Sequence, residues 1–108
     1  MPIDEGVAQI LRDDLAGEAI VEKKMFGGIA FMFRGHMLCG VHKGGAMFRV
    51  GKDSQAAALQ IPGAREMTFT GRPMGGMIET DSELLADDAR RKSLLGIALA
   101  FNRSQPPK

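Results

Sequence analysis

The 108-residue sequence contains no tryptophan, no tyrosine and only one cysteine. Without these aromatic residues there is no strong candidate for a platform on which single-stranded nucleic acid would stack, and we expect the phenylalanines to lie in the core. Because Cys39 has no second cysteine to pair with, no intrachain disulfide can form, which fits a reducing cytosol. The sequence therefore predicts a domain that folds without disulfides.

Long apolar runs are also missing. No run approaches the ~20 residues that span a bilayer, and the acidic start Met1-Pro2-Ile3-Asp4-Glu5 lacks the apolar core of a secretory signal. A chain of 108 residues has the size of one small domain, which buries roughly two-thirds of its unfolded surface. We expect one cytoplasmic domain over residues 1–108, with no membrane contact.

The formal net charge of +1 conceals four blocks of alternating sign. Residues 1–22 and 79–88 are acidic, whereas residues 23–78 and 89–108 are basic. The basic residues are scattered, whereas a DNA-binding surface usually shows a dense basic patch and a high pI. We interpret the blocks as acidic and basic segments that lie against each other in the fold. At most weak, salt-sensitive binding to DNA is expected.

Three apolar runs of strand length follow one another in the first half of the chain, at Phe26–Phe33, Met37–Val41 and Ala46–Val50. Short glycine-containing segments separate them, and glycine can adopt the positive φ that a hairpin turn needs. The stretch predicts a three-stranded meander. Two further strands are predicted at Met67–Phe69 and Met74–Glu79, where Gly75-Gly76 is typical of a bulge.

Helical patterns flank these strands. Apolar residues spaced three and four apart predict helices over Asp4–Leu15 and within Ser82–Arg103, the second as one helix or as two with a bend near Asp87-Asp88. Thr80 to Glu83 matches a capping box at the start of the second. A short helix is predicted at Ala56–Leu59, capped by Asp53 or Ser54.

The order of predicted elements is α-β-β-β-α-β-β-α. Adjacent strands with short turns favour a two-layer α+β fold, in which a mostly antiparallel five-stranded sheet packs against helices. Phe31 and Phe101 are expected to be buried between the sheet and the C-terminal helix.

Both faces of the predicted sheet carry apolar side chains. Ile29, Phe31 and Phe33 alternate with Phe26, Ala30 and Met32 along the first strand. Either helices cover both faces, or a second copy of the chain buries a methionine-lined face. Methionine fills irregular cores and also lines adaptable partner surfaces, so its abundance is compatible with both. The candidate interface consists of Phe26, Met32 and Met47, and a homodimer is the partner that it predicts.

The sequence shows no strong catalytic, metal or phosphate motif. His36 and His42 lack zinc-ligand spacing, and the glycine pairs lack the spacing of phosphate-binding loops. We expect no metal, no cofactor and no catalytic residue, and we interpret Cys39 as a small buried hydrophobe. The alternative is a small enzyme or ligand-binding protein with a pocket near Cys39, His42 and Arg49, in which a nearby cation would activate the thiol.

The segment Lys24-Met25-Phe26-Gly27-Gly28 and the meander after it resemble the TfoX N-terminal domain family, whose fuller members are bacterial competence regulators also called Sxy. The resemblance continues over nearly the whole chain, through Phe48-Arg49-Val50-Gly51, Ile61-Pro62-Gly63-Ala64-Arg65, Met67-Thr68-Phe69-Thr70-Gly71-Arg72-Pro73-Met74 and the ending Ala98 to Pro107.

This resemblance implies an α+β domain of the type-three-secretion-chaperone-like architecture. It also implies a role in bacterial transcription regulation, with the cyclic-AMP receptor protein as a partner. The competence regulators carry a further C-terminal helical domain, and this sequence ends at Lys108, so we do not carry over a role in DNA uptake. The family supplies no established catalytic residues. We therefore expect a stand-alone, non-enzymatic protein-interaction module.

Overall fold

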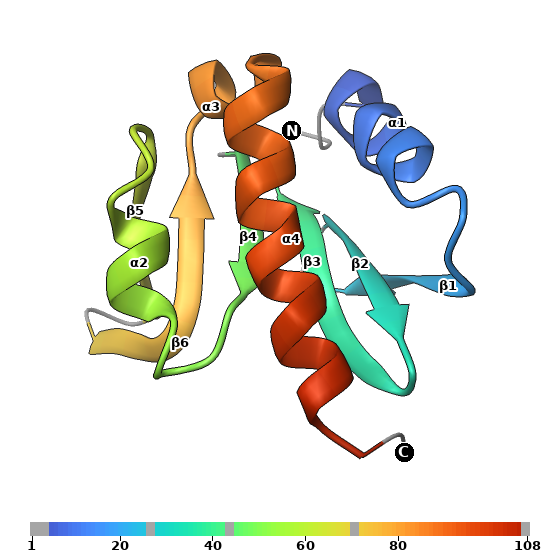
Figure 1. The fold of residues 1–108 in the computed structure, drawn as a ribbon. Coiled ribbons are helices and arrows are strands. Elements are labelled where there is room, and N and C mark those ends of the chain that lie inside the picture. The colour runs from blue at the N-terminus through green and yellow to red at the C-terminus, as the bar shows by residue number, and fades with distance from the viewer. Residues whose placement is uncertain (1–4, 26–27, 43–44, 70–71, 107–108) are drawn as a thin grey trace.

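A computed structural model describes residues 5–25, 28–42, 45–69 and 72–106 (Figure 1). These residues form helices and strands in the order α1 (Glu5–Asp14), β1 (Ile20–Met25), β2 (Gly28–Phe33), β3 (His36–His42), β4 (Gly45–Arg49), α2 (Gln55–Leu59), β5 (Ala64–Phe69), β6 (Arg72–Thr80), α3 (Ser82–Ala86) and α4 (Asp88–Ser104). The strands make one sheet in the order β1-β2-β3-β4-β6-β5, and all neighbouring strands are antiparallel. β1 and β5 are therefore its edges.

The predicted α+β class and antiparallel sheet are confirmed, but the predicted strand number is wrong because the described residues form six strands rather than five. The missed strand is β1, whose sequence IVEKKM carries three consecutive charged residues. Alternation fails there because β1 lies at an edge, and residues 21–24 are exposed on both of its faces.

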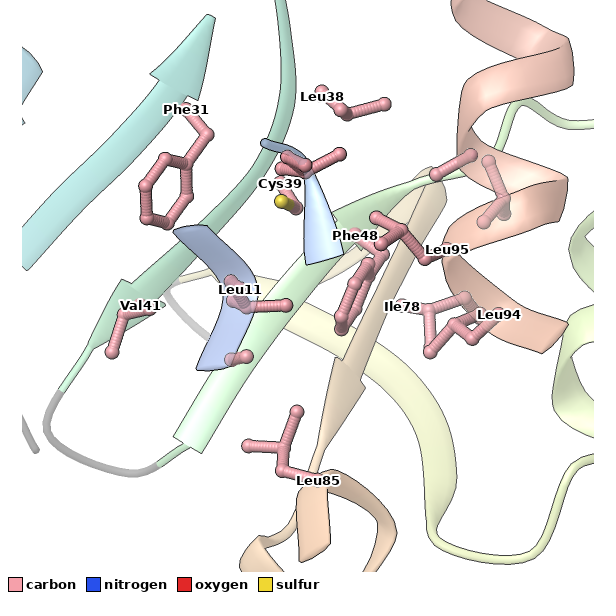
Figure 2. Close-up of a cluster of buried hydrophobic side chains, with 14 of the residues drawn as sticks. Leu11, Phe31, Leu38, Cys39, Val41, Phe48, Ile78, Leu85, Leu94 and Leu95 are labelled. Carbon is pink, nitrogen blue, oxygen red and sulfur yellow. The ribbon is translucent and has the colours of Figure 1, made fainter. Parts of the chain in front are cut away.

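The helices pack on one face of the sheet. α4 crosses β3 and β4, and α2 lies against β5 and β6 (Figure 1). Leu11 of α1 and Leu94 of α4 belong to the same buried cluster as Phe31 and Phe48 of the sheet (Figure 2). The predicted burial of Phe31 is confirmed, since its side chain is fully buried, whereas the predicted burial of Phe101 is wrong, because its side chain is only half-buried.

A β-bulge lets β3 contribute two adjacent side chains to this core. Phe31 pairs with Cys39 and Met32 with Met37, so Leu38 is the extra residue opposite β2. Strict alternation would turn either Leu38 or Cys39 away from the helices, but both are fully buried. Cys39 is thus a small buried side chain, as expected from the sequence.

The start of the C-terminal helices differs from the predicted capping box. Asp81, not Thr80, is the N-cap of α3, and its carboxylate accepts a hydrogen bond from the Leu84 N–H at 2.9 Å. The Thr80 hydroxyl is buried and donates to the Ala46 carbonyl at 3.3 Å. Asp87 then caps α4 by accepting from the Arg90 N–H, so the predicted Ser82–Arg103 segment is two helices.

A buried ion pair joins α1 to α4. The Arg91 Nε lies 2.6 Å from Asp14 Oδ2, and the two side chains are 5% and 10% exposed. Arg91 also donates to the Leu85 carbonyl and pairs with Asp88. At the other end of α4, Arg103 pairs with Glu18 at 2.9 Å. These contacts join the acidic first block to the basic last block.

Candidate functional site

The face of the sheet opposite the helices, here called the open face, is covered by none of the described helices. Strand register places one row of residues across it from edge to edge, because cross-strand partners share a face. The row consists of Lys23, Ala30, Gly40, Met47, Glu79 and Arg65. The next row, on one side of it, adds Val21, Met32 and Met37 and, on β4 and β6, the register partners Arg49 and Met77.

The middle of the open face is apolar and tightly packed. Ala30, Met47 and Met77 are 0%, 9% and 7% exposed, and they are the described buried apolar residues that do not belong to the main core. The Met47 methyl group lies 2.8 Å from where a Cβ of Gly40 would stand, so the absence of a side chain at Gly40 lets Met47 lie flat on the sheet.

The more exposed apolar residues of this face lie toward β1. Met32 and Met37 are half-buried, and Val21 is 57% exposed. Two residues of the predicted interface, Met32 and Met47, therefore share the open face. The third, Phe26, lies outside the described residues.

Charged groups occupy the far end of the open face. Glu79 lies between the Arg65 guanidinium and the His42 imidazole, with Arg65 Nε 3.0 Å from one carboxylate oxygen and His42 Nε2 3.4 Å from the other. Lys23 occupies the opposite end of the same row and is exposed. The open face is thus an apolar strip with the ion pair of Glu79 and Arg65 at one end and the ammonium group of Lys23 at the other.

The structure does not bring Cys39, His42 and Arg49 into one pocket. Cys39 faces the helices and is fully buried, His42 contacts Glu79 on the open face, and Arg49 stands at the opposite end of β4 from Gly45, the register partner of His42. Burial raises the pKa of the Cys39 thiol, and the nearby negative charge of Asp14 raises this pKa further. Such a thiol is poorly suited to be a nucleophile.

We expect Cys39 in the native protein to be protected from a thiol reagent such as DTNB at pH 8. Its reaction should require unfolding, and so should become as fast as that of free cysteine only in denaturant. The reaction is followed by absorbance, with the denatured chain as the control. A native rate close to that of free cysteine would contradict the buried assignment.

Among the described residues, no group of three or more His, Cys, Asp or Glu side chains could hold a metal ion. Within the same part of the chain, no helix is both long and apolar enough to cross a bilayer. We therefore take the open face, which extends across all the strands of the sheet, as the candidate functional site.

Among the comparisons with known proteins, one gives a match. No curated protein and no solved structure matches the chain significantly. Residues 13–102 match the TfoX N-terminal domain. This match begins in α1, includes the whole sheet and ends in α4. The chain therefore belongs to the TfoX N-terminal domain family.

Proposed function

We propose that this chain is a non-enzymatic protein-interaction module that acts through its open face, and that the first occupant of this face is a second copy of the chain. The observation that carries the proposal is the apolar row across a sheet whose described helices all lie on the other side. Methionine-rich surfaces adapt to partners, because the side chain is flexible and polarisable.

The charges of the row favour self-association. A two-fold axis at Gly40 would set Ala30 of one copy against Met47 of the other, and Lys23 against Glu79. At both ends of the interface the Lys23 ammonium group would then meet the Glu79 carboxylate, which Arg65 of its own chain also contacts, and this contact would fix the orientation. Burial of Val21, Met32 and Met37 would contribute about 25 cal/mol per Å² of apolar area removed from water, before the cost of association is subtracted.

Membership of the family extends the proposal to bacterial transcription regulation in the cytoplasm, with a transcription factor such as the cyclic-AMP receptor protein as a further partner. Contact with protein rather than DNA is supported by the arginines. Arg12, Arg65, Arg91 and Arg103 each pair with a carboxylate of the chain itself, which leaves few free guanidinium groups for phosphates.

The test of this proposal is Met32→Lys, with sedimentation velocity of the parent and the variant at tens of micromolar. The parent should sediment as a dimer and the variant as a folded monomer. An ammonium group on a half-buried stem can reach water in the monomer, whereas a paired face would bury it without a partner. Ala57→Lys, at an exposed position on α2, is the matched control and should remain dimeric.

Two results would contradict the proposal. A parent protein that is monomeric at these concentrations rejects the dimer. An unfolded Met32→Lys variant, seen by circular dichroism, would mean that Met32 belongs to the core of the monomer.

A further inference from the structure

A surface hollow of about 440 Å³ lies where β4 leaves the sheet, beside Arg49, the register partner of Met77 on the open face. Three separate segments form it: residues 49–54, which begin with the last residue of β4, residues 75–76 of β6, and residues 101 and 104 of α4. Its volume is within the range of pockets that hold small molecules.

Glycine residues keep the hollow open. Gly51 and Gly76 have φ of 82° and 81°, and the N–H groups of Val50 and Gly51 both donate to the Gly76 carbonyl, at 2.9 and 3.1 Å. A Cβ at Gly51 would collide with the ring of Phe101. A Cβ at Gly75 would lie 3.1 Å from Cε of Lys52, whose stem occupies that space.

Arg49 is the polar group that distinguishes this hollow. Its guanidinium carbon lies 5.6 Å from the centre of the Phe101 ring, and it has no hydrogen bond or ion pair with any described residue. The other arginines whose side chains the structure describes each contact a carboxylate or a backbone carbonyl, as shown by Arg12, Arg34, Arg65, Arg90, Arg91 and Arg103. Arg49 therefore presents its N–H donors at the wall of the hollow with no acceptor from this part of the chain.

The neighbouring charges add up to a positive site. Lys52 lines the hollow, is exposed and pairs with no carboxylate of the described residues, while Asp53 opposes these two cations. A guanidinium group binds phosphate or carboxylate through two parallel hydrogen bonds, and an ammonium group adds a point charge. The half-buried Phe101 ring offers an apolar surface beside them.

We propose that this hollow binds a small organic anion, with its phosphate or carboxylate group on Arg49 and Lys52 and its apolar body against Phe101. The site borders the open face through Arg49, the register partner of Met77, but none of these three residues belongs to the row from Lys23 to Arg65. The negative charge of Asp53, which also lines the hollow, would repel the anion and so weaken its binding.

The experiment is a titration of the labelled parent protein by ¹H–¹⁵N NMR with two probes, phenyl phosphate and benzoate. Saturable shifts are expected at the amides of residues 49–54 and 75–76 for at least one probe, and the tighter probe identifies phosphate or carboxylate as the preferred group. Inorganic phosphate should bind more weakly than phenyl phosphate, because it lacks the apolar body. The neutral probe benzyl alcohol should not saturate the site.

Arg49→Gln should weaken binding of the preferred probe at least about tenfold, as expected for loss of charge-assisted hydrogen bonds. Arg12→Gln, which removes a guanidinium from α1 and lies outside both the hollow and the open face, is the matched control and should bind like the parent. Asp53→Asn should bind more tightly. If Arg49→Gln fails to fold, Lys52→Gln replaces it and should weaken binding several-fold.

Four outcomes would overturn the proposal. These are no saturable binding of either anion at millimolar concentrations, unchanged affinity in the folded Arg49→Gln or Lys52→Gln variant, shifts confined to other parts of the chain, and benzyl alcohol binding as tightly as the anions.

Discussion

Phe31→Ala should destabilise the protein by about 3–5 kcal/mol, a large part of the ~5–15 kcal/mol that keeps a typical domain folded. Phe31 is fully buried beneath α1 and beside Cys39, so truncation of its ring leaves a cavity that helices fixed by their own contacts cannot fill. Urea denaturation followed by circular dichroism measures the loss as a lower midpoint at an unchanged slope.

Phe101→Ala is the comparison for this variant. Its ring is half-buried and borders the hollow, so less apolar surface is lost from the core and water can replace the ring. We expect a clearly smaller loss of unfolding free energy than for Phe31→Ala. Equal losses, or a Phe31→Ala protein as stable as the parent, would show that the assignment of the core face is wrong.

Asp14→Ala should be the second strongly destabilising change, at about 3 kcal/mol, because it removes the main partner of a buried cation. The Arg91 side chain is 5% exposed and would retain only the Leu85 carbonyl and the carboxylate of Asp88, whose side chain is 77% exposed. The same urea experiment measures this loss.

The double variant Asp14→Leu with Arg91→Met distinguishes the contribution of the ion pair to the free energy of unfolding from the cost of leaving one charge buried without a partner. Because it buries neither charge, its stability should return to within about 1 kcal/mol of the parent or exceed it. A double variant as unstable as Asp14→Ala would mean that the contact between α1 and α4 depends on this ion pair and not on apolar packing.

The regular elements of this fold follow from local pattern. The meander was predicted because glycine turns separate apolar runs, and the C-terminal helices because apolar residues recur every three or four positions. β1 was missed because an edge strand buries little of either face, so nothing in its sequence has to alternate. The bulge at Leu38 was also not predictable, since it depends on the partner strand.

Two polar residues of α4 show a second reason for missed contacts. Arg91 and Asn102 are 4% and 2% exposed, and they continue the helical spacing of Leu94, Leu95 and Ala98. The amide of Asn102 donates to the Phe33 carbonyl at 3.0 Å. A search for apolar periodicity omits such residues, but extending the period through polar positions would have found them.

The open face could be predicted from the sequence in part, whereas the hollow could not. Met32 and Met47 were assigned to a possible partner surface because both sheet faces carry apolar residues. The hollow, in contrast, combines segments about 25 residues apart in the chain, and no spacing rule brings Arg49 near Phe101. Only tertiary structure shows that Arg49 lacks the acceptor that the other described arginines have.

Charged residues on the two edge strands, β1 and β5, oppose assembly by addition of further strands to the sheet. The outer backbone of an edge strand can accept another strand, and a long edge without charged residues promotes fibril growth in this way. Here, Lys23 and Lys24 on β1 and Arg65 and Glu66 on β5 are exposed charged residues on those edges. Open-ended strand addition at these two edges is therefore disfavoured.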